Sequence, residues 1–375
     1  MTQTTKENPL SSFRTWLALV AAVVLATGAS ACGSSNNKSD TSASGGSGGA
    51  SGTVNGAGST FAAPIYQQWG NALKDKGITV NYQPVGSGAG IAQLAAGTAD
   101  FGASDPALTP EDRATLKKGP AVQIPMAFGA ITVAYNLSGV KKGLKLDGAT
   151  VADIFLGKVK KWNDPAIAKL NPGVSLPGDA ITVVHRSDES GTTKGFTGFL
   201  GDYSKEWSSK VGSDKTVKWP TGTGAKGNDG VAAAVKQQSG AVGYVEEAFA
   251  LQNNFTTAAV KNKAGNYVEP TLASTTAAGD GVTVPKDLGL SIINSPNPKS
   301  YPISSQTFVM VYKDLCKGGL DKSKAGAVKG FIDYGLGEGQ GVLGQLQYAK
   351  LPAPLLKKSQ AASSSLTCNG SPVTG

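Results

Sequence analysis

The chain has 375 residues, of which 40% are hydrophobic and 16% charged, and its formal net charge is +9 at pH 7. This charge does not indicate nucleic-acid binding, because the lysines are scattered among acids and only three arginines occur, whereas nucleic-acid-binding surfaces depend on arginine forks and aromatic stacking. One histidine, His185, and three cysteines leave too few ligands for an ordinary zinc site and a single candidate base for a Ser-His-Asp triad.

The N-terminus has the pattern of an export signal. A polar, positively charged stretch precedes an apolar run over 16–26, which is about as long as a signal-peptide core and too short to span a bilayer. Small residues then lead to Cys32, and this arrangement resembles a bacterial lipobox, although Ala29 stands where a leucine is usual. We expect residues 1–31 to be a signal peptide and Cys32 to be lipidated; an ordinary signal peptide cleaved near Ala31 is the alternative.

The next segment, residues 32–52, is predicted to be a flexible tether. It consists mainly of Gly, Ser, Asn, Thr and Ala, and such a composition cannot bury enough apolar surface to offset the entropy lost on ordering. With a lipid on Cys32, the tether would hold the protein at the outer face of the cell membrane. The remaining body, residues 53–375, is too long for one small core and is suited to two lobes.

The first part of the body alternates strands with helices. Strands are predicted over 53–55, 78–83 and 99–103, and helices over about 65–77 and 86–96. Each strand ends in a loop of small residues that opens a helix or a turn. This is the layout of an α/β domain, in which ligands gather at the carboxyl ends of the strands.

A second set of elements begins near Phe128. Its strands are predicted over 131–135, 181–185 and 242–245, and its helices over 151–156, 166–170 and 231–238. A long β-rich segment, 301–312, and a terminal helix over 325–335 are expected to return to the first lobe. The chain would then cross twice between two lobes, lobe I comprising 53–127 and 302–375 and lobe II comprising 128–301.

Two further cysteines, Cys316 and Cys368, lie near the C-terminus. In an exported chain, two remaining cysteines form a disulfide more often than a reactive pair. A disulfide between them would fix the C-terminal tail to the body. Two unpaired thiols are the alternative.

Four hydroxyl residues share one setting, in or just after a glycine-bearing loop and near a predicted helix start: Thr60, Ser87, Ser190 and Thr192. Helix N-termini present unpaired N–H groups and the positive end of the helix dipole, which favour an anion. Arg186 would add a permanently charged, planar fork suited to a tetrahedral oxyanion. Helix capping would explain any one of these hydroxyls, but the four together predict an oxyanion site.

Seven motifs occur in order along the body: GAGSTF at 56–61, VGSG at 85–88, DFGASD at 100–105, KWND at 161–164, RSDESGT at 186–192, GNDG at 227–230 and GAVGYVE at 240–246. In these motifs the chain resembles the periplasmic phosphate-binding proteins of the bacterial high-affinity phosphate importer, over nearly the whole mature body. Departures are modest: His185 and Glu189 lie beside motif positions where other members of the family carry different residues.

The resemblance implies an α/β fold of the two-lobed periplasmic-binding-protein type (type II), with the ligand in a cleft between lobes joined by two hinge strands. It implies that inorganic phosphate is bound by Thr60, Phe61, Ser87, Asp105, Arg186, Ser190, Gly191 and Thr192. Asp188 would steady Arg186. The protein would deliver phosphate to the membrane permease and ATPase subunits of an ABC importer, as a monomer without cofactor, metal, catalytic residue or nucleic-acid partner.

A carboxylate at Asp105 would repel an anion unless the ligand carries a proton. Phosphate near neutral pH keeps an O–H that can donate to Asp105, whereas sulfate has none and would leave a buried acceptor unpaired. We therefore expect phosphate to be preferred over sulfate. The alternatives are the same fold tuned to sulfate or molybdate, and a secreted phosphatase-like enzyme that uses the same pocket.

Two other features invite a functional interpretation. His185 would point away from the cleft if Arg186 points into it, because side chains alternate along a strand, so we interpret His185 as a packing or surface residue. Residues 222–227 match the GxGxxG pattern of dinucleotide-binding loops, and Glu246 lies near the distance expected for a ribose contact. Pro220 interrupts the strand that should precede this loop, so we expect it to be structural or part of the closing rim.

Overall fold

A computed structural model describes residues 51–140 and 143–374. The predicted signal peptide, Cys32 and nearly all of the tether lie outside the described residues. Within the described part of the chain, no helix is both long and apolar enough to cross a bilayer.

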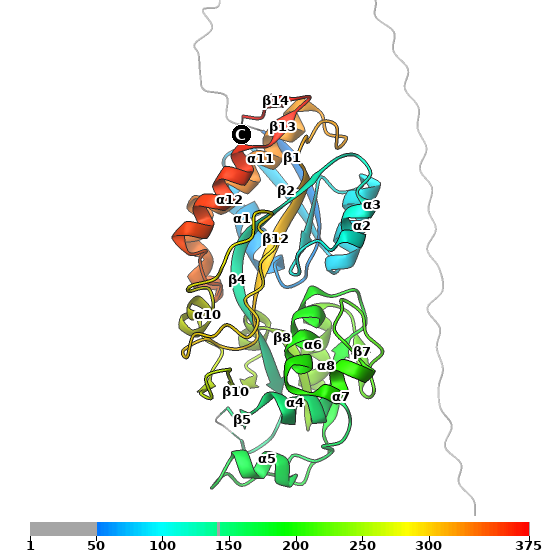
Figure 1. Cartoon of the computed structure of the whole chain (residues 1–375), viewed down its shortest axis with the longest axis vertical. Coiled ribbons are helices and arrows are strands. Elements are labelled where there is room, and N and C mark those ends of the chain that lie inside the picture. The colour runs from blue at the N-terminus through cyan, green and yellow to red at the C-terminus, as the bar shows by residue number, and fades with distance from the viewer. Residues whose placement is uncertain (1–50, 141–142, 375) are drawn as a thin grey trace, which may run out of the picture. The chain divides into compact units, whose positions relative to one another are not determined.

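The body is organised around a nine-stranded sheet with the strand order β2-β1-β3-β12-β4-β8-β6-β7 and with β9 paired to β4. The strands are β1 Gly52–Gly58, β2 Ile78–Pro84, β3 Phe101–Ser104, β4 Ala121–Tyr135, β6 Thr182–Arg186, β7 Thr223–Ala225, β8 Ala241–Glu246, β9 Thr256–Thr257 and β12 Ser304–Tyr312. Strand β4 belongs to both halves, because residues 121–130 pair with β12 and residues 131–135 pair with β8. We call the half on the β12 side the first lobe and the half on the β8 side the second lobe; Figure 1 shows them above and below the middle of β4.

The first lobe carries helices α1 Ala63–Lys74, α2 Ser87–Ala96, α3 Pro110–Thr115, α11 Lys322–Leu336 and α12 Ala353–Ser364, with the 3-10 helix η1 Glu338–Leu346. Its core contains an aromatic cluster of Tyr66, Trp69, Phe101 and Phe331, all fully buried. Tyr66 and Trp69 come from the buried face of α1, which also includes Ile65 and Leu73. This packing fixes α1 and β3, so that the loops after β1 and β3 are held at the boundary with the second lobe.

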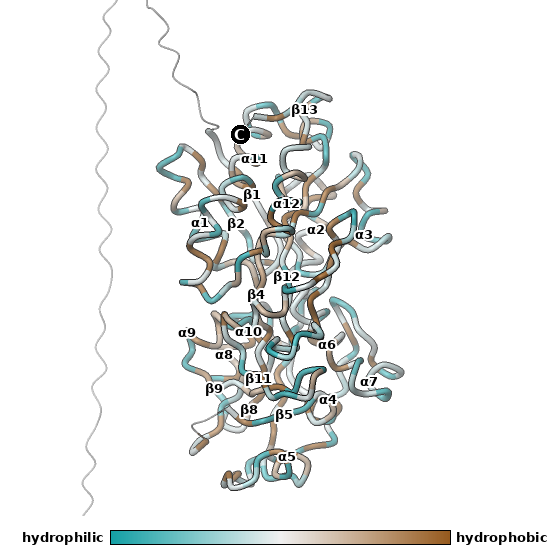
Figure 2. Tube along the Cα trace, turned by 60° about the vertical axis from the view of Figure 1, so that its left-hand side comes forward, coloured by the Kyte–Doolittle hydropathy of each residue, from teal (hydrophilic) through white to brown (hydrophobic). Residues whose placement is uncertain are grey.

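The second lobe and the region beside β4 carry α4 Gly148–Phe155, α5 Pro165–Leu170, α6 Gly191–Tyr203, α7 Lys205–Lys210, α8 Gly227–Gln237, α9 Glu247–Gln252 and α10 Leu272–Ala278. A small sheet joins β5 Lys145–Leu146, β10 Ala259–Lys261 and β11 Tyr267–Val268. Phe196 of α6 stacks on Tyr244 of β8 with ring centroids 4.3 Å apart, which anchors α6 to the sheet. Hydrophobic residues concentrate along the central strands, whereas many connecting loops are hydrophilic (Figure 2).

The structure differs from the sequence-based expectations at two elements. Strand β4 begins at Ala121, ten residues before the predicted strand over 131–135; its Pro125 lies next to a shift of register against β12, where a missing N–H is tolerated. The prediction of a terminal helix over 325–335 is wrong in one respect: α11 covers these residues, but η1 and α12 follow it.

The C-terminal tail is fixed to the first lobe. Strands β13 Thr367–Cys368 and β14 Ser371–Pro372 form a hairpin, and Cys368 is joined to Cys316 by a disulfide. The predicted disulfide is thus confirmed. Asp314, close to Cys316 in the chain, also accepts the N–H groups of Asn369 and Gly370 at 2.9 and 2.8 Å.

Candidate functional site

Loops from the two lobes converge where their strands end. In the first lobe, Thr60 follows β1, Ser87 begins α2 and Asp105 follows β3. In the second lobe, Arg186 ends β6 and residues 190–192 begin α6. All eight residues predicted to bind phosphate, Phe61 included, are buried, and the N-termini of three helices, α2, α6 and α8, are directed at this region by the contacts described below.

Arg186 supplies the positive charge of the site. Its side chain is 1% exposed, and its Nε donates to Asp188 Oδ1 at 2.7 Å while Nη2 pairs with Asp188 Oδ2. Burial alone would raise the pKa of Asp188, but the hydrogen bonds and charge of Arg186 hold it below its ordinary value. Nη1 is directed elsewhere, donating to Thr192 Oγ1 at 3.3 Å. Asp188 thus fixes the plane of the guanidinium and leaves the Nη1 side facing the site.

The hydroxyl groups are linked across the two lobes. Ser87 Oγ accepts the N–H of Gly191 at 3.1 Å. Thr60 Oγ1 accepts from Asn228, both from the backbone N–H at 3.2 Å and from the side-chain Nδ2 at 2.8 Å. These bonds bring the N-termini of α2, α6 and α8 to one place, where the positive ends of their helix dipoles favour an anion.

Two of the predicted site residues also have structural roles. Ser190 is the N-cap of α6, and its Oγ accepts the N–H of Thr193 at 3.0 Å. Phe61 is fully buried, and its carbonyl accepts the hydroxyl of Tyr348 at 2.6 Å. The chain around Thr60 and Ser190 is therefore held rigidly in both lobes.

Asp105 is the one carboxylate among the residues predicted to bind phosphate directly. Its Oδ1 accepts from Ser59 Oγ at 2.6 Å and from Thr307 Oγ1 at 2.9 Å. Burial raises the pKa of Asp105 to about 6, against the lowering effect of these hydrogen bonds and of Arg186. Its other oxygen, Oδ2, lies beside Gly191, so an acceptor faces the start of α6.

Glycine is required where the lobes touch. A Cβ on Gly191 would collide with Asp105 Oδ2 and Ser87 Oγ of the opposite lobe. A Cβ on Gly88 would collide with the side chain of Glu189, and the N–H of Gly88 donates to the Glu189 carbonyl at 3.1 Å. The lobes are therefore in close contact at the site, and small residues permit it.

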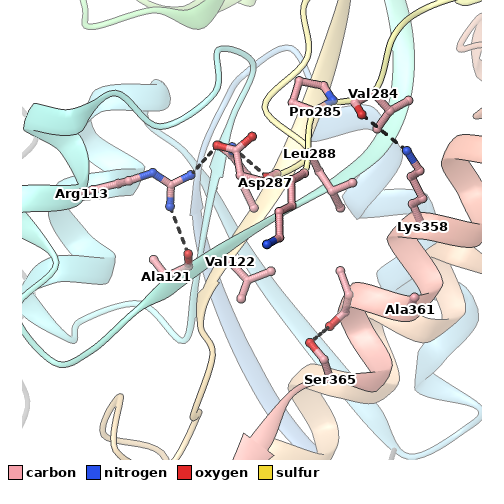
Figure 3. A pocket seen from close by; sticks show the side chains of 13 residues that line it. Arg113, Ala121, Val122, Val284, Pro285, Asp287, Leu288, Lys358, Ala361 and Ser365 are labelled. Carbon is pink, nitrogen blue, oxygen red and sulfur yellow. Dashed lines mark hydrogen bonds and ion pairs between the residues drawn. The ribbon is translucent and has the colours of Figure 1, made fainter.

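A separate groove of about 720 Å³ lies between the start of β4, residues 284–288 and α12 (Figure 3). At its edge, Arg113 donates to the Ala121 carbonyl at 3.1 Å and to Asp287 Oδ2 at 3.2 Å. None of the predicted phosphate-binding residues lines this groove. Arg113 is thus engaged in packing the first lobe, whereas Arg186 lies among the predicted phosphate-binding residues.

The two remaining sequence features have structural roles. His185 stacks on Trp219 with ring centroids 4.7 Å apart, and burial lowers its pKa. Within residues 222–227, β7 pairs in parallel with β6, and the N–H of Gly227 donates to Asp188 Oδ1 at 3.1 Å. This loop therefore supports the Arg186–Asp188 pair.

Sequence reasoning missed three residues that complete the site. Ser59 and Thr307 bind Asp105, and Asn228 binds Thr60. Asn228 lies in the GNDG motif, which has the composition of a turn. Thr307 lies in a buried strand 202 residues from Asp105, so no local signal marks it.

The chain matches the family model described as a PBP superfamily domain over residues 43–338. Among curated proteins it is similar to the phosphate-binding protein PstS of Pasteurella multocida, with 44% identity over 82% of this chain and 89% of that protein. Among solved structures it is similar to a human phosphate-binding apolipoprotein, with a TM-score of 0.68 and 20% identity over 86% of this chain and all of that chain. It also resembles an ABC-type phosphate transport receptor from Vibrio cholerae, with a TM-score of 0.52 and 19% identity over 80% of this chain and all of that chain.

Proposed function

The chain belongs to the PBP superfamily and, within it, to the family of phosphate-binding proteins called PstS, and from this premise we propose how it captures its ligand. It is an extracytoplasmic solute-binding protein with the two-lobed α/β fold of its family, which captures inorganic phosphate for an ABC-type importer. The observation that carries this function is the buried Arg186, whose Nη1 is not used by Asp188 and lies among hydroxyls and helix N-termini from both lobes.

The proposed ligand contacts follow from this arrangement. Phosphate would be bound by hydroxyl groups, backbone N–H groups and one guanidinium. The residues that supply these donors are Thr60, Phe61, Ser87, Arg186, Ser190, Gly191 and Thr192. Asp105 would accept the proton that phosphate retains near neutral pH. Asp188 would act through Arg186 by fixing its orientation. Many charge-assisted hydrogen bonds in a buried site support micromolar or tighter binding, about −8 kcal/mol or better.

Asp105 gives the proposed selectivity for phosphate. A buried acceptor facing sulfate would lack a donor, and an unpaired buried charge discriminates far more strongly than a loss of packing. Asp105→Asn would present an N–H₂ group in place of Oδ2. That variant should lose affinity for phosphate and gain affinity for sulfate, because the amide can donate to a sulfate oxygen.

Isothermal titration of the wild-type protein and Asp105→Asn with phosphate, sulfate and molybdate tests this proposal. We expect the wild-type protein to bind phosphate at least a hundredfold more tightly than sulfate, a difference of about 2.7 kcal/mol. Comparable wild-type affinities for the two anions would refute the role of Asp105. So would a variant that binds phosphate as before without gaining sulfate.

We also propose an oligomeric state, a lack of enzymatic activity, a lipid anchor and a transport partner, each of which needs its own test. The protein would be a monomer without enzymatic activity, so it should release no phosphate from a simple phosphomonoester. Cys32 would carry the lipid that anchors it to the membrane, which mass spectrometry of the native N-terminus would detect. The permease and ATPase subunits of the importer would receive the phosphate.

The predicted lobe boundaries, 53–127 with 302–375 and 128–301, stand as a proposal. Strand β4 changes its partner from β12 to β8 between residues 130 and 131, and this change supports a crossing there. Strand β12 lies antiparallel to both β3 and β4, which supports the return of the chain to the first lobe.

A further inference from the structure

Asn228 is a fully buried amide at the start of α8, and none of the motif residues assigned to phosphate binding includes it. Its side chain contacts three other elements. Oδ1 accepts the N–H of Glu246 at the end of β8 at 2.9 Å. Nδ2 donates to Thr60 Oγ1 at 2.8 Å and to Thr192 Oγ1 at 3.4 Å. Asn228 therefore touches one proposed phosphate-binding hydroxyl from each lobe.

The backbone of β8 fixes which way the amide faces. The Glu246 N–H can only donate, so it must meet the oxygen of the Asn228 amide and not its nitrogen. The nitrogen, which can only donate, is then directed at the two threonines. Its orientation is set by the fold and does not depend on the ligand.

The consequence is a fixed direction for both hydroxyl protons. Thr60 Oγ1 accepts from the N–H and the Nδ2 of Asn228, so both of its lone pairs are occupied. Thr192 Oγ1 accepts from Arg186 Nη1 and from Asn228 Nδ2, so both of its lone pairs are occupied as well. Each hydroxyl can then act only as a donor toward a third group.

We propose that Asn228 is a positioning residue for phosphate, which fills the acceptor sites of Thr60 and Thr192 so that both hydroxyls donate to the ligand. This inference rests on the proposed function. Apart from the O–H that would be donated to Asp105, phosphate offers only acceptors, so a hydroxyl already oriented as a donor loses no freedom when phosphate enters. Asn228 would contribute affinity without touching phosphate.

The test is a double-mutant cycle read by phosphate titration in phosphate-free buffer. Asn228→Ala should weaken phosphate binding about tenfold, because two ordinary hydrogen bonds no longer orient the hydroxyls. In the background Thr60→Val with Thr192→Val, the hydroxyls are absent and the same substitution should change affinity by less than about twofold. An equal loss in both backgrounds would overturn the proposal, since Asn228 would then act by holding α8 to β8.

Two further variants keep the test decisive. Asn228→Asp retains the acceptor for the Glu246 N–H but cannot donate at neutral pH, so it should lose at least as much affinity even if Asn228→Ala folds poorly. Asn171 is the matched control: it is buried in the second lobe, and its side-chain amide forms hydrogen bonds with Lys145 and Ile167, neither of which is a proposed site residue. Asn171→Ala should lower the melting temperature without changing phosphate affinity. Unchanged affinity in Asn228→Asp would overturn the proposal, whereas failure of the wild-type protein to bind phosphate would instead contradict the proposed function.

Discussion

At the scale of single residues, the buried charged groups of the site differ in how they are compensated. Arg186 is neutralised by Asp188, with which it forms a bidentate pair, so the free protein does not hold an unpaired buried cation. Among the residues that the structure describes, Asp105 has no such cationic partner, and it relies on the hydroxyls of Ser59 and Thr307. The cost of burying a charge therefore falls mainly on Asp105.

Asp105 should make the stability of the phosphate-free protein depend on pH. Burial raises its pKa from 3.8 in the unfolded chain to about 6 in the folded protein. A carboxyl group whose pKa is higher in the folded than in the unfolded protein contributes to the free energy of unfolding. This contribution is fully present below about pH 4 and is lost as the pH rises through about 6. Relative to Asp105→Asn, the wild-type protein should lose about 3 kcal/mol of unfolding free energy between these pH values, at about 1.4 kcal/mol per pKa unit.

Urea unfolding of both proteins at pH 4 and pH 7, without phosphate, measures this difference. Other buried carboxylates with raised pKa values, Glu246 and Glu247, are present in both proteins and cancel in the comparison. A wild-type curve parallel to that of the variant would show that Asp105 stays charged without cost.

How much of the site could be predicted depends on how far along the chain each residue lies from the groups that it contacts. Ser87 and Ser190 could be proposed as site residues because glycine-bearing loops and helix starts lie beside them in the chain. Asn228 could not, because its partners Thr60 and Thr192 are 168 and 36 residues away. Sequence reasoning thus finds the residues whose local backbone prepares them for an anion, and misses those that act on another side chain.

The same limit applies at the scale of elements. Helices with a clear apolar face, such as α1, were predictable by their spacing, whereas α12 follows Pro352, which offers no side-chain cap, and carries little apolar patterning. Strand β4 was only half predicted, because Pro125 interrupts a run that tertiary pairing with β12 nonetheless completes. Tertiary contacts decide both cases, and these contacts are not local in sequence.

The disulfide is expected to stabilise the C-terminal hairpin without affecting the ligand site. Cys316 and Cys368 are 52 residues apart, and closing a loop of that length restricts the unfolded chain by about 4 kcal/mol in the loop-entropy account. Replacing both cysteines by serine should lower the unfolding free energy by up to that amount. Phosphate affinity should stay within about twofold, because neither cysteine contacts a proposed site residue.

Thermal unfolding and phosphate titration of Cys316→Ser with Cys368→Ser, compared with the wild-type protein, test both halves of this expectation. Reduction of the wild-type protein is the parallel control, since it breaks the same bond without a substitution. A loss of phosphate affinity at unchanged stability would mean that the tail contributes to the site, which contradicts the contacts described above.

At the scale of the whole body, contacts outside the proposed ligand loops also join the two lobes. One is an ion pair between Asp112 of α3 in the first lobe and Lys215 of the second lobe, with Nζ and Oδ1 2.6 Å apart. Both side chains are mostly buried, at 13% and 16% exposed, so the pair is screened less than a surface pair. The carbonyl of Lys215 also accepts the N–H of Ser190, so the pair lies one contact away from the start of α6.

This ion pair joins the two lobes beside the site, so we expect it to slow the release of phosphate. Lys215→Met keeps the aliphatic stem and the backbone carbonyl but removes the charge, and it should weaken phosphate binding about fivefold, equivalent to about 1 kcal/mol for a well-formed pair. The loss should appear mainly as faster dissociation in stopped-flow measurements, because the pair joins the two lobes, and it should change little at high salt, because the pair is mostly buried. Lys210→Met removes the same charge from an exposed pair with Glu206 within the second lobe, and it should leave phosphate dissociation unchanged. If both variants release phosphate faster than the wild-type protein and to the same extent, net charge and not the contact between the lobes governs release. If neither variant releases phosphate faster than the wild-type protein, the Asp112–Lys215 pair does not slow release.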